Sequence, residues 1–256
     1  MVMRADRALW RWWVRATTVI ASAGAVAVGL LGTSPVAVAQ PTMVDCDANP
    51  GALQPALIAA APGATLRVRG TCIGNFTLAK TVTLVGLRNA VLDGNHAGTT
   101  VDVRAGVQAT LRNLVITDGS ATLGGGILND GSLTLTRSTV QNNTAFRGGG
   151  IISTGGSTLM LTSSVVQNNT ATDGGGGIYN SGMAILDRST VQNNSAPTGG
   201  GIFNDSGSLT LTGSTVQNNT ATISGGGIFN FAGTVTLVRS TVSGNVPNNC
   251  TAVSGC

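Results

Sequence analysis

The sequence contains no glutamate, only one histidine and one tyrosine, and few charged residues of any kind. Charged side chains make up 9% and aromatic side chains 4% of its 256 residues, whereas charged residues are roughly a quarter of an ordinary soluble domain. A protein rich in surface helices needs Glu, Lys, Ala and Leu on its exposed positions. The sequence therefore argues against a helical fold, and its many Gly, Thr, Ser, Asn and Val residues favour strands and turns.

The first forty residues differ from the rest. An apolar run over 19–31 follows four arginines, and 37–39 reads Ala-Val-Ala. This pattern is typical of a secretory signal peptide, which we predict over 1–39 with cleavage after Ala39. The run is shorter than the roughly 20 residues of a membrane-spanning helix, so no membrane span is expected after cleavage. The predicted localisation is secretion or the bacterial cell surface.

The charge of the predicted mature chain is nearly balanced. Residues 40–256 hold nine Arg, one Lys and nine Asp, a net charge of 10 − 9 = +1, and all three Trp lie before residue 40. A nucleic-acid-binding surface needs clustered basic residues, with aromatic residues between them when it binds single strands. A nucleic-acid partner is therefore not expected.

Four cysteines remain in the mature chain: Cys46, Cys72, Cys250 and Cys256. An even number in an exported chain, without paired Cys-x-x-Cys spacings, favours disulfides over metal binding. Three pairings are open. We favour Cys46 with Cys72 and Cys250 with Cys256, because each pair would staple one end of the chain.

A repeat of about 25 residues occupies the second half of the sequence. Ser-Thr-Val-Gln-Asn-Asn-Thr-Ala or a variant of it recurs five times, with its central valines 26, 25, 25 and 26 residues apart. A Gly-Gly-Gly-Ile string precedes each copy. Between the two strings, aliphatic residues alternate with small ones, the period of a strand with one buried face. The valines are Val140, Val166, Val191, Val216 and Val242.

One such unit is too short to bury a core, so the units must stack. If each unit forms one turn of a coil, its strands pair in parallel with their copies about 4.8 Å away. We predict an all-β parallel β-helix (solenoid) of about eight turns over residues 64–245. An N-terminal cap at 40–63 would include a short helix over 53–61, and 246–256 would form a C-terminal tail.

The recurring asparagines and glycines have local explanations. Asn143, Asn169, Asn194 and Asn219 recur at one place in the coil, where Asn can adopt a left-handed backbone and bond to its copies above and below. The Gly triplets permit close turns and lack the Gly-Gly-x-Gly-x-Asp pattern of calcium-binding repeats. No metal or cofactor is expected.

The two strings resemble those of right-handed parallel β-helix proteins of the pectin-lyase-like superfamily, over about residues 64–245. They are also similar to the repeats of chlamydial polymorphic outer-membrane proteins, with 125–127 as Gly-Gly-Ile and a Val140-to-Asn143 string in which Val replaces Phe. The resemblance implies a right-handed coil. It also implies a group that contains polysaccharide lyases, glycoside hydrolases and adhesins, so activity has to be argued from individual residues.

One group of residues could support catalysis. Asp93, His96, Asp102 and Asp118 lie in the early, less regular turns, with Arg104 and Arg112 nearby in sequence. These could supply an acid, a base and an anion-binding group. The alternative, which we favour, is that the Asp-Gly pairs form turns and that the histidine is a surface loop residue.

A second group could form a binding surface. If the isoleucine after each Gly triplet points inward, the next residue points outward, and these residues form a vertical apolar row. An exposed row would suit contact with a glycan or another partner. Alternatively, a flanking loop covers the row or its side chains lie inside. The row consists of Leu128, Ile152, Tyr179, Phe203 and Phe229.

The regular repeats and the sparse reactive residues favour a secreted, non-catalytic protein for adhesion, surface attachment or polysaccharide binding. The alternative is a polysaccharide lyase or glycoside hydrolase that uses the early Asp/His group. The expected partner is a polysaccharide or a cell surface, and the sequence leaves the oligomeric state open.

Overall fold

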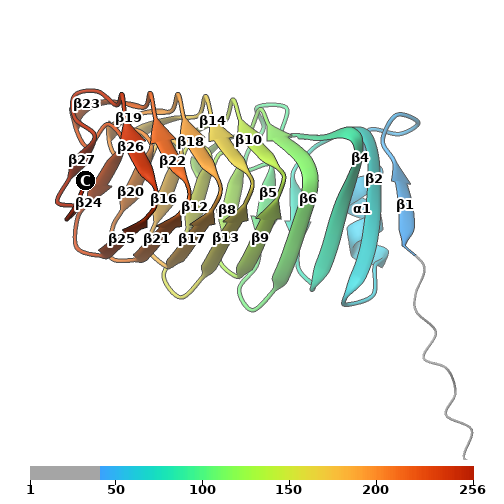
Figure 1. Cartoon of the computed structure of the whole chain (residues 1–256). Helices are drawn as coiled ribbons and strands as arrows, with labels where there is room; N and C mark the ends of the chain where they lie inside the picture. The colour runs from blue at the N-terminus through green and yellow to red at the C-terminus, as the bar shows by residue number, and fades with distance from the viewer. Residues whose placement is uncertain (1–40) are drawn as a thin grey trace, which may run out of the picture. The chain divides into compact units, whose positions relative to one another are not determined.

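The computed structural model describes residues 41–256, so the predicted signal peptide at 1–39 lies outside the described residues. Three parallel sheets form the sides of a coil in which each strand pairs with its copies in the adjacent repeats (Figure 1). The central valines pair in register along the coil, from Val140 with Val166 to Val216 with Val242. The predicted parallel β-helix is therefore confirmed.

The largest sheet, sheet A, has 14 strands and includes a bend. In the early coils one long strand runs through the bend, whereas from β9 onward each coil contributes one short strand on either side of it, and β6 pairs with both β9 and β10. Eight strands from β2 to β25 follow one another on one side of the bend, which gives about eight turns. Sheet A consists of β1 (Thr42–Asp45), β2 (Ala64–Ile73), β4 (Val82–Asp93), β6 (Gln108–Thr117), β9 (Ser132–Thr136), β10 (Thr139–Gln141), β13 (Thr158–Thr162), β14 (Val165–Gln167), β17 (Met183–Asp187), β18 (Thr190–Gln192), β21 (Ser208–Thr212), β22 (Thr215–Gln217), β25 (Thr234–Val238) and β26 (Thr241–Ser243).

Two smaller sheets complete the coil. Sheet B has eight strands, five of which begin at the isoleucine of a Gly-Gly-Gly-Ile string. Sheet C has five strands, four of which begin directly after a pair of asparagines. Sheet B consists of β3 (Phe76–Leu78), β5 (Val101–Val103), β8 (Ile127–Asn129), β12 (Ile151–Ser153), β16 (Ile178–Asn180), β20 (Ile202–Asn204), β24 (Ile228–Asn230) and β27 (Cys250–Thr251). Sheet C consists of β7 (Ser120–Leu123), β11 (Thr144–Arg147), β15 (Thr170–Gly174), β19 (Ser195–Thr198) and β23 (Thr220–Ser224).

The core is a set of aliphatic ladders along the axis of the coil. Leu133, Leu159 and Leu209 occupy one ladder and are at most 1% exposed. Threonines between the aliphatic residues of a strand point outward, as the period-two pattern predicts. In the last coil the equivalent residues Val235 and Leu237 are only partly buried, because no further coil covers them.

The asparagine corner differs from the prediction in one respect. The buried residues Asn143, Asn169, Asn194, Asn219 and Asn245 form an amide ladder with Nδ2–Oδ1 distances of 2.9 to 3.0 Å. The left-handed backbone belongs instead to the residue that precedes each of them, an exposed asparagine in four coils, such as Asn142 and Asn168, both with φ of 56°, and Gly244 in the last. The first asparagine therefore turns the chain, and the second fills the interior and satisfies its neighbours.

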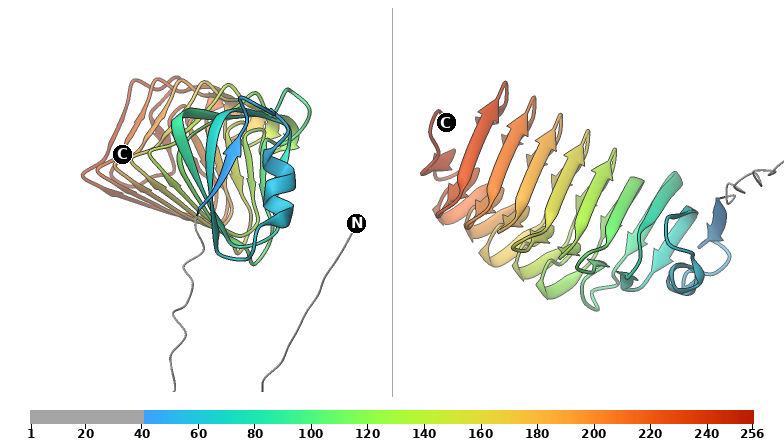
Figure 2. Two further views of the ribbon diagram at one scale, coloured as in Figure 1. Left: turned by 90° about the vertical axis from the view of Figure 1, so that its right-hand side faces the viewer. Right: turned by 90° about the horizontal axis from the view of Figure 1, so that it is seen from below.

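The N-terminal end of the coil is covered. Helix α1 (Leu53–Ala59) buries Leu53 and Leu57, and its Gln54 side chain accepts a hydrogen bond from the Thr77 amide of β3 at 2.9 Å. The helix therefore covers the free edge of sheet B, and it lies beside the first coils when the molecule is seen from this end (Figure 2). Strand β1 lies within the predicted cap, but pairs with β2 and extends sheet A.

The C-terminal boundary extends beyond the prediction, because β27 pairs with β24 inside the predicted tail. Disulfides join Cys46 to Cys72 and Cys250 to Cys256, the pairing expected from the sequence. Among the described residues, no helix is long and apolar enough to cross a membrane.

Candidate functional site

Three residues of the early Asp/His group, Asp93, His96 and Asp118, lie at the corner that follows β4 and β6. Asp93 ends β4 opposite Thr117 of β6, so Asp93 and Asp118 lie on neighbouring coils. The Asp93 carboxylate accepts the Asn95 amide at 2.8 Å, and the Asp118 carboxylate accepts the Thr117 hydroxyl at 3.0 Å. The His96 amide donates to the Asp118 carbonyl at 2.7 Å. Both carboxylates therefore form hydrogen bonds that stabilise these turns.

Asp102 belongs to a different surface. It lies on β5 in sheet B, and its carboxylate forms an ion pair with Arg104 at 3.1 Å. Burial raises the pKa of Asp102, Arg104 opposes this shift and Asp130 adds to it. Within residues 41–256, no hydrogen bond or ion pair joins Asp102 to Asp93, His96 or Asp118, and no three His, Cys or Asp side chains gather as a metal site.

The apolar row forms in register along sheet B, but it is not an exposed stripe. Ile152 and Tyr179 are only 5% and 7% exposed, and Leu128, Phe203 and Phe229 are half-buried. The rings of Tyr179 and Phe203 stack at 4.9 Å, and those of Phe203 and Phe229 at 5.1 Å. The row is packed against itself, which corrects the expectation of an open apolar surface.

The Gly triplets are the reason for this burial. Gly148 and Gly175 adopt φ of 64° and 67°, and a β-carbon on either would lie 2.9 Å from an atom of Ile152 or Tyr179. The chain therefore turns back close to the row. The Arg147 guanidinium, paired with Asp173 at 2.5 Å, lies 5.5 Å from the centre of the Tyr179 ring. Burial raises the pKa of Tyr179, Asp205 adds to this shift and Arg147 opposes it.

An open recess lies at the bend of sheet A. Strand β4 has four residues, 86–89, opposite the single Asn113 of β6, because the register shifts between Val85 and Ala90. Gly86 allows this crowding, since a side chain there would collide with the Asn113 carbonyl. The recess has a volume of about 380 Å³ and is lined by Gly86, Arg88, Asn113, Leu114, Val115, Arg137 and Thr139.

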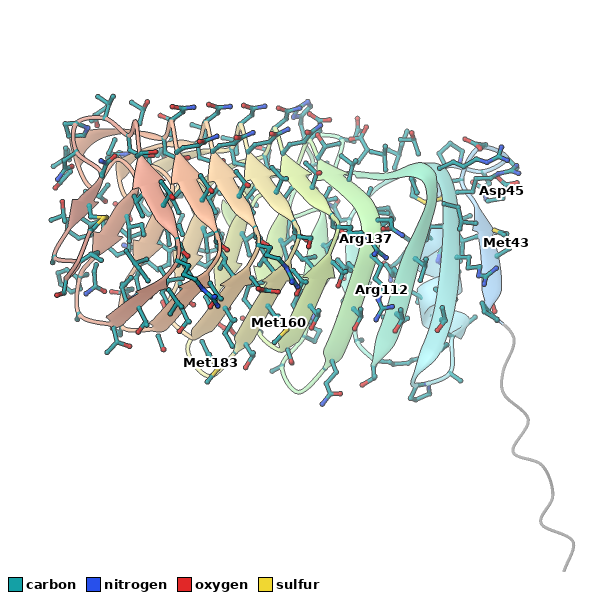
Figure 3. The ribbon with its side chains drawn as sticks, in the orientation of Figure 1. Met43, Asp45, Arg112, Arg137, Met160 and Met183 are labelled. Carbon is teal, nitrogen blue, oxygen red and sulfur yellow. A yellow bond between two sulfur atoms is a disulfide. The ribbon has the colours of Figure 1, made fainter. Side chains whose placement is uncertain are left out.

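The recess has a positive lining. Arg137 donates from Nε to Oδ1 of Asn113 at 3.1 Å, a neutral partner that orients the guanidinium. Arg112 lies next to Asn113, and both Arg112 and Arg137 lie on the outer face of sheet A (Figure 3). Among the described residues, no ion pair involves Arg88, Arg112 or Arg137. The recess therefore presents guanidinium groups without carboxylate partners.

Polar ladders continue from the recess along sheet A. On β10, β18 and β22 the central valine is buried, and the flanking Thr and Gln point outward. The glutamines bond to one another along the coil, for example Gln192 to Gln167 at 2.9 Å and Gln217 to Gln192 at 3.0 Å. The glutamines therefore continue in register over four successive coils, whereas the threonine ladder is interrupted at Val165 of β14.

Comparison with protein families matches residues 78–255 of the chain to the family described as the right-handed β-helix region. The protein belongs to the right-handed β-helix family. This family is consistent with the resemblance to the pectin-lyase-like superfamily, whereas the likeness to the chlamydial repeats stays a prediction. No curated protein and no solved structure matches the chain.

The arginines at the bend of this right-handed β-helix were missed by the sequence analysis. The nearly balanced net charge of the predicted mature chain gave no sign of them, because nine aspartates offset the charge of the arginines. A signal was present in the repeat, since Arg-Ser-Thr-Val recurs at Arg137, Arg188 and Arg239. Their common place three residues before an aligned valine puts these arginines at one corner, and the structure adds Arg88 to them.

Proposed function

We propose that the protein is a secreted, non-catalytic β-helix that binds an extended polysaccharide along the outer face of sheet A and so attaches to a surface. The observation that carries this proposal is the in-register ladder of outward Gln side chains on β10, β14, β18 and β22, beside which an outward Thr lies on each of these strands except β14. Repeated amide groups along one line, with hydroxyls beside most of them, suit a polymer with repeated hydroxyl groups, because successive coils can offer similar hydrogen bonds.

Two further features support this proposal. In the early Asp/His group the carboxylates of Asp93 and Asp118 accept turn hydrogen bonds and that of Asp102 pairs with Arg104 on another surface, so the group does not form one acid-base site. The two disulfides suit an oxidising compartment outside the cytosol. The apolar row is not used in this proposal, because its central side chains are buried.

Retention of the purified protein on neutral and acidic polysaccharides tests the proposal. Thr190→Val with Thr215→Val removes two hydroxyls from sheet A, whereas Thr170→Val with Thr220→Val makes the same chemical change on exposed positions of sheet C. Two lost hydrogen bonds of about 1 kcal/mol each predict roughly 30-fold weaker binding for the sheet A variant. The sheet C variant should bind as the unaltered protein does.

Equal retention of both variants, or equal loss in both, would contradict the use of sheet A. Failure of the unaltered protein to bind any polysaccharide would reject the function itself. Thermal unfolding curves of both variants show that any loss of binding is not a loss of folded protein.

A further inference from the structure

We infer that the bend of sheet A carries a row of arginines that binds the anionic groups of an acidic polysaccharide at intervals of two coils. This inference rests on the proposed function and specifies the class of polysaccharide. Each coil passes the bend through a single residue whose backbone is in the left-handed conformation.

The residues at this corner all have φ between 48° and 54°, and they follow one another one coil apart. Such a backbone favours Gly and Asn, and it is unfavourable for residues with longer side chains. Asn113 and Gly213 meet this requirement, but arginine does not. The turn alone therefore does not explain the arginines. The corner consists of Arg88, Asn113, Arg137, Ser163, Arg188, Gly213 and Arg239.

Arginine occupies every second coil of this corner. Arg88, Arg137, Arg188 and Arg239 alternate with the shorter residues Asn113, Ser163 and Gly213. Two coils at the spacing of parallel strands separate successive arginines by about 9.6 Å along the axis.

The shorter residues leave room between the arginines. The recess of about 380 Å³ lies between Arg88 and Arg137, beside Asn113. A β-carbon on Gly213 would lie 3.7 Å from Cγ of Arg188, so that Arg188 extends over the small residue next to it. A recess therefore separates the first two arginines of the row, whereas Arg188 lies over the glycine of the next coil.

The charge on this row is largely uncompensated. Arg69, Arg104 and Arg147, which lie elsewhere, each form an ion pair with an aspartate. Of the four row arginines, only Arg188 forms one among the described residues, with the adjacent Asp187 at 2.7 Å. The other three are available for an external anion.

A carboxylate or a sulfate matches a free guanidinium, because both present paired oxygen acceptors to its planar donors. Four guanidinium groups in a line, three of them free, suit a linear polymer whose anionic groups recur about every 10 Å, the distance between alternate coils. The same polymer can contact the Thr and Gln ladder beside the row. The ligand class is therefore a polysaccharide that carries carboxylate or sulfate groups.

Binding to polygalacturonate, dextran sulfate and neutral dextran over a series of salt concentrations tests the row. The test variant is Arg137→Asn with Arg239→Asn, because neither arginine forms an ion pair among the described residues and Asn113 shows that this corner accepts Asn. A matched control, Arg104→Gln with Arg147→Gln, removes the same charge away from the row. We expect roughly fivefold weaker binding to an acidic polymer for each row arginine removed, a smaller salt dependence, and unchanged binding of the control.

Comparison of polygalacturonate with dextran sulfate identifies the anionic group: tighter binding to the first indicates carboxylate, and tighter binding to the second indicates sulfate. Equal losses for the test and control variants would overturn the row, because binding would then follow net charge alone. Undiminished binding by the test variant, together with loss in Thr190→Val with Thr215→Val, would reject the row but retain the proposed function. Tighter binding to DNA than to either acidic polysaccharide would also overturn the inference.

The spacing has its own test, which conserves charge. Ser163→Arg with Arg188→Ser moves one arginine by one coil without changing composition. Weaker binding to the acidic polymer supports recognition at two-coil intervals, and unchanged binding contradicts it.

Discussion

A second asparagine ladder, formed by Asn129, Asn180, Asn204 and Asn230, runs along the end of sheet B. Ser153 and Ser157 interrupt it. Ser153 pairs with Asn129 and Asn180 of the adjacent coils, where the ladder residue is Asn. Ser157 stands where Gly131 and Gly182 stand in those coils. The two serine hydroxyls bond at 2.7 Å, and Oδ1 of buried Asn180 has no partner. One serine pair thus replaces an Asn and a Gly, but does not supply the missing donor.

The double replacement Ser153→Asn with Ser157→Gly is expected to raise the free energy of unfolding by about 1–3 kcal/mol, because the new amide would donate to Asn180. Ser153→Asn alone should destabilise the protein, since its amide would collide with the Ser157 hydroxyl. Urea unfolding of the single and double variants measures the coupling. A single variant as stable as the double would show that the hydroxyls do not compete with an amide for this space.

At the scale of the strand, β21 separates the two faces of sheet A within neighbouring residues. Leu211 is fully buried in an aliphatic ladder, whereas Thr210 points outward and is half-buried. Leu211→Ala should lower the free energy of unfolding by about 2–5 kcal/mol because it leaves a cavity. Thr210→Ala should cost less than about 1 kcal/mol. Denaturant unfolding measures both, and equal costs would mean that the faces are assigned the wrong way round.

At the scale of the whole coil, each repeat contacts only its neighbours, so the end coils are the least supported. The disulfide between Cys46 and Cys72 ties the segment before α1 to β2, with both sulfurs buried, and spans 26 residues. The disulfide between Cys250 and Cys256 spans only 6 residues, at the end where Val235 and Leu237 are partly exposed.

Replacement of Cys46 and Cys72 by Ala should therefore lower the free energy of unfolding by about 2–4 kcal/mol. The same change at Cys250 and Cys256 should cost about 1 kcal/mol less on loop length alone. Denaturant unfolding under non-reducing conditions compares the two variants. A larger loss at the C-terminal pair would contradict this order and would make the last coil the limiting element.

The sequence by itself determined the coil, its period and the inward aliphatic residues, and it favoured the cysteine pairing that the structure has. Stacked repeats place each residue beside its copy. A steady spacing of valines such as Val140 and Val166 therefore predicts which residues pair in the folded coil. For the same reason the sequence predicts that Asn143 bonds to its copies in an amide ladder.

Only the tertiary structure decided which outward rows are open. Tyr179 and Phe203 alternate outward as predicted, but turns at glycines such as Gly175 bring the chain back close to them. The repeat already places Arg137 and Arg188 at one corner, since they lie 51 residues apart at the same place in their repeats, whereas the recess beside Arg137 and the pairing of Arg188 with Asp187 depend on the folded coil. Alternation along a strand sets the direction of a side chain, whereas its exposure depends on what the rest of the coil places over it.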